Sequence, residues 1–210
     1  WIGTQYFNKK VVYFAALFYV VTPLFSFYDR QALMESSITA VNIWSCYFFL
    51  RSIENPIRKY AIWLGAILGI GFFIKSSTLI LIFTYIILGI IIFLMQFRKN
   101  KIYFKNFLLV VFVILIINIL LLINPGFWNT LYLTNRYSLS ILELLRFPIS
   151  IWAQNIGGFL EISLWHTTLL GILAASGMVV AVKSSDRQLK YMVLWIVITI
   201  LLLVLFAKSI

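Results

Sequence analysis

Residues 76–97 read SSTLILIFTYIILGIIIFLMQF, a run of 22 residues without a charged side chain. A transmembrane helix needs about 20 predominantly apolar residues, so this run is long enough to cross a bilayer. Lys75 precedes it, and the basic stretch RKNK follows at 98–101. Charges at both ends of an apolar run are typical of the limits of a membrane span.

The rest of the chain has the same character. It is 63% hydrophobic and 11% charged, with a mean hydropathy of +1.02, whereas soluble domains are about 25% charged. Further apolar runs lie at 11–28, 36–50, 60–74, 107–124, 160–182 and 191–207. We therefore predict an all-α fold, a polytopic transmembrane bundle of about seven spans that forms one domain over residues 1–210. The runs at 36–50 and 60–74 are short, so we expect them to tilt in a thinned bilayer or to extend into flanking polar residues.

The basic residues predict the orientation of the bundle, because short cytoplasmic loops collect Lys and Arg. With the amino end inside, the cytoplasmic segments hold 12 of the 17 basic residues and 2 of the 6 acidic residues. The basic loops then act as topology signals beside anionic membrane lipid. We expect no nucleic-acid partner, although a pI near 9.9 would suggest one in a soluble chain.

The longest stretch outside the predicted spans runs from about residue 125 to 158, on the outer face. Apolar residues recur in it at helical spacing, and Pro148 breaks the run. The apolar residues are Leu139, Leu142, Leu145, Ile149 and Trp152. This pattern predicts an interfacial helix, which either roofs a lipid-facing cavity or serves as a structural lid.

A stripe of small residues, Ala61, Gly65 and Gly69, recurs every four positions. Such a stripe lets a second helix approach closely, and we interpret it as a packing surface.

The segment YDRQALME at 28–35 is the densest polar group of the outer face. Arg30 there, with Lys75, suits a phosphate head group. The carboxylate of Glu35 suits deprotonation of an acceptor or, as the one metal considered, a divalent ion. For each residue alone, the role of interface anchor is an equal alternative. Further residues expected to line an outer cavity are Asp29, Arg136, Glu161 and Lys208. We expect no cofactor and no dedicated set of metal ligands.

Three segments, ALFYVVTP at 16–23, RQALME at 30–35 and GAILGIGFFIK at 65–75, resemble GT-C glycosyltransferases of the protein mannosyltransferase type, glycosyltransferase family 39. That group includes the lipid A aminoarabinose transferases. The shared order is a proline-ended apolar run, an Arg followed five residues later by an acid, a basic loop and a Gly-rich helix that ends in Lys. NPGFW at 124–128 and LFAK at 205–208 also have counterparts, so the resemblance extends over nearly the whole chain.

The resemblance implies transfer of a sugar from a polyprenyl-phosphate carrier to a lipid or protein acceptor on the non-cytoplasmic face, in a bacterial plasma membrane. Glu35 matches the second acidic position, where Asp is commoner, and is the expected catalytic-site carboxylate in an acceptor-binding or site-organising role. Arg30 and Lys75 match positions near the carrier phosphate. The resemblance places the catalytic base in a first external loop before Trp1. We therefore expect a fragment that lacks the first span, that loop and the C-terminal part, and that is inactive alone.

Two alternatives remain. A transporter or flippase of a lipid-linked glycan would need paired polar residues in mid-membrane, and the chain offers few, chiefly Asn42, Asn118 and His166. A non-catalytic membrane subunit is the other alternative, and it is favoured if the full-length chain lacks an acidic first external loop.

Overall fold

A computed structural model describes residues 8–21, 34–96, 101–133, 138–163 and 168–208. Within these ranges the regular elements are helices, which confirms the predicted all-α class. The helices that run along the bundle are α2 (Lys9–Val21), α4 (Met34–Glu54), α5 (Arg58–Ile74), α6 (Thr78–Gln96), α7 (Lys101–Ile117), α12 (Thr168–Lys183) and α13 (Arg187–Phe206).

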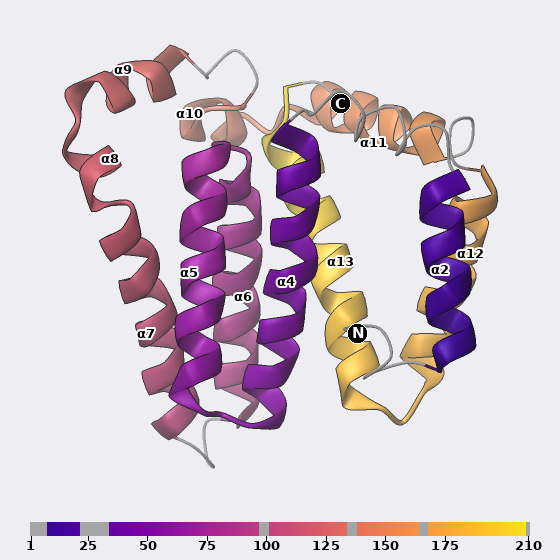
Figure 1. The fold of residues 1–210 in the computed structure, drawn as a ribbon. Helices are drawn as coiled ribbons and strands as arrows, with labels where there is room; N and C mark the ends of the chain where they lie inside the picture. The colour runs from indigo at the N-terminus through magenta and orange to yellow at the C-terminus, as the bar shows by residue number, and fades with distance from the viewer. Residues whose placement is uncertain (1–7, 22–33, 97–100, 134–137, 164–167, 209–210) are drawn as a thin grey trace.

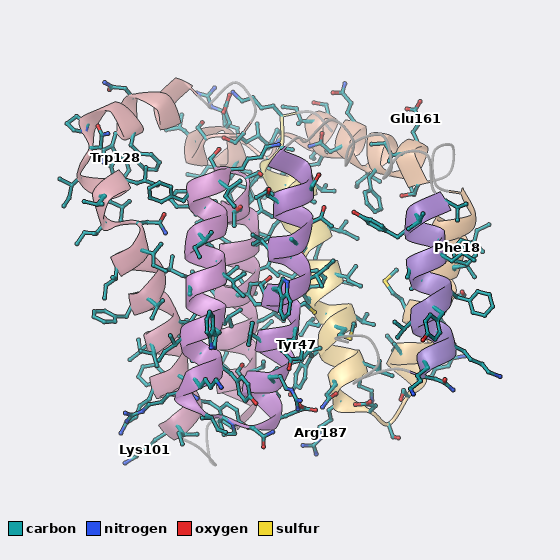
Figure 2. The ribbon with its side chains drawn as sticks, viewed as in Figure 1. Phe18, Tyr47, Lys101, Trp128, Glu161 and Arg187 are labelled. Carbon is teal, nitrogen blue, oxygen red and sulfur yellow. The ribbon has the colours of Figure 1, made fainter. Side chains whose placement is uncertain are left out.

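These helices alternate in direction (Figure 1). Lys101 and Arg187 lie at one end of the bundle, and Trp128 and Glu161 lie at the other (Figure 2). We call these ends the Arg187 end and the Lys75 end, since α5 reaches the second end immediately before Lys75. The alternation agrees with the order of loops that the charge pattern predicts.

The two short apolar runs belong to longer helices. The run at 36–50 lies within α4, which has 21 residues, and the run at 60–74 lies within α5, which has 17. Both therefore extend into flanking polar residues, one of the two expected solutions. By length and composition α13 is the one helix of the described residues that is long and apolar enough to cross a membrane, with shorter apolar helices at Thr78–Leu94 and Gly171–Lys183. The count of seven spans stays a prediction.

The small-residue stripe on α5 packs against α7. A Cβ atom added at Gly65 would lie 2.8 Å from the carbonyl oxygen of Val110, and one at Gly69 would lie 3.1 Å from the Cβ of Ile117. Both distances are too short for a relaxed contact, so only glycine allows the two helices to come this close. The stripe is a packing surface, as the spacing predicts.

Side-chain amides and a hydroxyl hold α7 in place at three levels. Near the Arg187 end, Tyr103 Oη donates to the carbonyl of Ile53 at 3.0 Å, and Asn106 Nδ2 donates to that of Pro56 at 2.9 Å. Nearer the Lys75 end, Asn118 Nδ2 donates to the carbonyl of Gly69 at 3.2 Å. In a low-dielectric interior these bonds satisfy groups that would otherwise be costly to bury.

Short helices lie across the Lys75 end (Figure 1). They are α8 (Ile119–Ile123), α9 (Pro125–Leu133), α10 (Ile141–Leu145) and α11 (Ile149–Glu161). The predicted interfacial helix is thus two helices, α10 and α11, with the break at Arg146–Pro148. Proline disfavours helical backbone in the residue before it, and Phe147 adopts the left-handed region with φ 51°.

Candidate functional site

The structure describes part of the residue set expected to form the site. Asp29, Arg30 and Arg136 lie outside the described residues, as does His166. Glu35 lies in the first turn of α4, where the backbone is described and the side chain is not. The pairing of Arg30 with Glu35 therefore stays a prediction.

Three of the other candidates gather at one end of the bundle. The first turn of α4, the connection after α5 and the end of α13 all lie at the Lys75 end (Figure 1). These elements carry Glu35, Lys75 and Lys208 respectively. The shared end is the arrangement that the alternating spans predict.

Lys75 sits in a tight, well-bonded turn. Its backbone N–H donates to the carbonyl of Gly71 at 3.0 Å and so ends α5. The same carbonyl accepts a hydrogen bond from Oγ1 of the fully buried Thr78 at 2.9 Å, at the start of α6. A Cβ at Gly71 would lie 2.7 Å from a methyl group of Val41, so α4 packs against this turn. The depth of Lys75 in the bundle is fixed by these contacts.

Lys208 forms an ion pair that the sequence did not predict. Its Nζ lies 3.2 Å from Oε1 of Glu143 in α10. The other carboxylate oxygen, Oε2, accepts hydrogen bonds from the backbone N–H and the hydroxyl of Ser140, both at 2.8 Å. Ser140 and Glu143 form a capping box at the start of α10, so the expected cavity-lining role of Lys208 comes with a structural role.

The environment of Glu143 makes it a poor proton acceptor. Backbone and side-chain hydrogen bonds from Ser140, followed by the contact with Lys208, lower the pKa of this carboxyl to about 2. A general base works best with a pKa near the operating pH. Glu143 therefore stabilises the local fold instead. The spacing Ser-x-x-Glu in the sequence is the signal that would have identified it.

The segment that begins at Ser138 is clamped to the end of α13. The N–H of Leu139 donates to the carbonyl of Phe206 at 2.7 Å, within an isolated bridge between Ser138 and Ala207. Nδ2 of the fully buried Asn155 donates to two carbonyls of that end, Val204 at 2.9 Å and Ala207 at 2.8 Å. We call these contacts the α13 clamp. It fixes α10 and α11 over the bundle.

Sequence reasoning missed Asn155 because its partners lie about 50 residues away along the chain. The available signal was a polar residue on the apolar face of an amphipathic helix. Such a residue is buried at a cost unless it finds a partner.

Glu161 does not lie within a membrane span. The expected span at 160–182 starts later, because α11 ends at Glu161 and α12 begins at Thr168. Glu161 is exposed at the Lys75 end (Figure 2). Its role as a residue that lines a cavity stays a prediction.

Within the described parts of the chain, no group of three or more His, Cys, Asp or Glu residues is placed to hold a metal ion. The divalent ion considered for Glu35 is untested.

Polar side chains in the middle of the bundle bond between helices. Oη of Tyr85 in α6 donates to Oγ of Ser45 in α4 at 3.0 Å, and the hydroxyls of Thr84 and Thr199 join α6 to α13 at 3.2 Å. Asn118 bonds to α5 as described above. Interhelical hydrogen bonds of this kind stabilise helix association in membranes, and packing alone accounts for them.

The family profile for dolichyl-phosphate-mannose-protein mannosyltransferases matches residues 2–152, over two thirds of the chain. The chain belongs to this family. The family comprises membrane glycosyltransferases of the GT-C type, which confirms the resemblance drawn from the sequence motifs. The match takes in α2, the helices from α4 to α10 and the first turn of α11. Comparison with the curated proteins and with the solved structures finds no match.

Proposed function

We propose that this protein transfers a sugar from a polyprenyl-phosphate-linked donor to a lipid or protein acceptor on the non-cytoplasmic side of the membrane. The observation that carries the proposal is the family match over residues 2–152. It includes the turn that holds Lys75 and the first turn of α4 that holds Glu35.

In the proposed reaction an acceptor oxygen attacks the anomeric carbon of the sugar while the bond to the carrier phosphate breaks. Negative charge grows on the departing phosphate, and cations placed beside it stabilise the transition state. Arg30 and Lys75 are the proposed cations. Arg30 offers paired donors, and Lys75 offers a single charge at a depth fixed by its turn.

Glu35 is the proposed carboxylate on the acceptor side. A carboxylate within hydrogen-bonding reach of a hydroxyl can orient it or accept its proton. The position of Glu35 in the first turn of α4 suits this role, since a helix amino terminus stabilises the charged form of a carboxylate.

The test is transfer by the purified full-length protein in liposomes supplied with polyprenyl-phosphate sugars. The double variant Arg30→Ala, Glu35→Ala is expected to lose at least about 100-fold in turnover, the usual effect of removing one transition-state donor. The matched control is Arg187→Ala, which removes a charge at the opposite end of the bundle and should leave transfer unchanged. Wild-type transfer by the double variant would remove the site assignment.

A further inference from the structure

An apolar cavity lies between the helices on the α5 and α7 side of the bundle. Its volume is about 70 Å³, and its walls come from α5, α6, α7 and the last turns of α4. Most of the lining side chains are branched or aromatic, among them Leu64, Ile86, Phe107, Val110 and Ile114. A water molecule takes about 30 Å³ in the liquid, so the cavity has room for roughly two groups of that size.

The polar side chains that line the cavity already donate hydrogen bonds within the protein. The bonds are Ser52 Oγ to the carbonyl of Phe49, Tyr85 Oη to Ser45 Oγ, Tyr103 Oη to the carbonyl of Ile53, and Asn106 Nδ2 to the carbonyl of Pro56. A polar ligand would have to displace one of these bonds. The occupant that fits the walls is therefore a hydrocarbon.

The depth of the cavity is set by the helices that line it. Along α5, Leu68 and Ala61 line the cavity and lie seven and fourteen residues before Lys75. At 1.5 Å per residue these positions are about 10 and 21 Å from the Lys75 turn. A bilayer core is about 30 Å thick. The cavity therefore begins before the midplane and ends beyond it, as measured from the Lys75 end.

We propose that this cavity holds a distal segment of the polyprenyl chain of the donor, and this inference rests on the proposed function. A carrier whose phosphate lies near Lys75 can follow α5 and α6 down to the cavity, since both helices start or end at that turn. An acyl chain of a phospholipid anchored at the same end stops near the midplane. The longer polyprenyl chain continues to the depth of Ala61.

The test is photolabelling of the full-length protein in phosphatidylcholine liposomes. One probe is a polyprenyl phosphate with a diazirine at its distal end, and the matched probe is a phosphatidylcholine with a diazirine at the end of an acyl chain. The polyprenyl probe is expected to label the cavity-lining parts of α6 and α7, identified by mass spectrometry of peptides. Excess unlabelled polyprenyl phosphate should compete, and excess phosphatidylcholine should not. Equal labelling by the acyl probe, or label absent from these helices, would overturn the proposal.

A substitution that fills the cavity gives a second readout. In Ala61→Phe the new ring occupies the space, and loss of burial for two CH₂-sized groups weakens binding about tenfold, so labelling should fall by about that factor. The matched control is Ile62→Phe, one residue along on the exposed face of α5, which should label as the wild type does. Ile86→Phe fills the cavity from α6 and replaces Ala61→Phe if that variant does not fold.

Labelling separates this proposal from the proposed function, because it needs no sugar transfer. A protein that transfers sugar but is not labelled in the cavity contradicts the cavity proposal alone. A protein that is labelled in the cavity but transfers no sugar contradicts the proposed function alone.

Discussion

Substitution of Gly65 by alanine tests the close packing of α5 on α7. The added Cβ would lie 2.8 Å from the carbonyl oxygen of Val110 and 2.8 Å from the Cβ of Val113. The first obstacle is backbone and cannot turn aside. Overpacking of this kind costs about 1–3 kcal/mol, and the gain in helix propensity from Gly to Ala offsets about 0.8–1.0 kcal/mol of that cost.

Gly177 in α12 provides the matched control. A Cβ there meets no atom within 4 Å, so Gly177→Ala gains the propensity term without the overpacking cost. The difference between the two variants isolates the overpacking term, about 1–3 kcal/mol in favour of Gly177→Ala. Gly69→Ala should fall between them, since its Cβ would meet the side chain of Ile117 at 3.1 Å.

The assay is thermal unfolding of the purified full-length variants in detergent, followed by the fraction that stays monodisperse on gel filtration. For a chain of this size 1 kcal/mol shifts the midpoint by about 2–4 °C, so Gly65→Ala should melt several degrees below Gly177→Ala. Equal midpoints, or a higher midpoint for Gly65→Ala, would refute the packing of α7 on the stripe.

Three further predictions concern the α13 clamp and the bundle interior. Asn155→Ala leaves two buried carbonyls at the end of α13 without their donor and should destabilise the protein by about 1–3 kcal/mol in thermal unfolding; the exposed Asn129→Ala should be neutral, and equal effects would refute the clamp. Because the pKa of Glu143 is lowered from 4.5 to about 2, its contribution to stability is complete above about pH 4.5 and is lost as the pH falls towards 2. Melting curves of Glu143→Gln should lack that acid loss, and a wild-type loss between pH 6 and 8 would contradict the assignment. A double-mutant cycle on Thr84→Val and Thr199→Val should give a coupling of about 0.6 kcal/mol, and additive effects would mean that the hydroxyls do not interact.

The helices of the bundle could be predicted because hydropathy is a local property of the sequence. The ends of α4 and α5 could not, because polar residues near them are satisfied inside the helix. Arg51 and Glu54 pair at 3.0 Å in the last turn of α4, and Ser52 donates to the carbonyl of Phe49. Such bonds let a helix continue past the point where its apolar run stops.

The tertiary contacts at the Lys75 end were beyond prediction from one sequence. The ion pair of Lys208 with Glu143 and the bonds of Asn155 join segments about 50 or more residues apart. Local patterns do not encode which helices meet. The capping box of α10 is the exception, since its two residues are three apart and their spacing can be read directly.

The candidate site divides in the same way. The order of the motifs predicted the family and the common end of Glu35, Lys75 and Lys208, because alternating spans dictate which loops share a face. The start of the span at 160–182 was wrong, since Glu161 ends α11 before α12 begins. An apolar stretch that includes an interfacial helix and a span has no break that hydropathy alone reveals.

The most direct test of the account is sugar transfer by the full-length protein in liposomes, with polyprenyl-phosphate sugar supplied and product measured on the acceptor. We predict transfer by the wild-type protein and by Arg187→Ala, and a loss of at least about 100-fold in Arg30→Ala, Glu35→Ala. Undiminished transfer by the double variant would contradict the site. Movement of the intact lipid-linked sugar across the bilayer without transfer would contradict the proposed function.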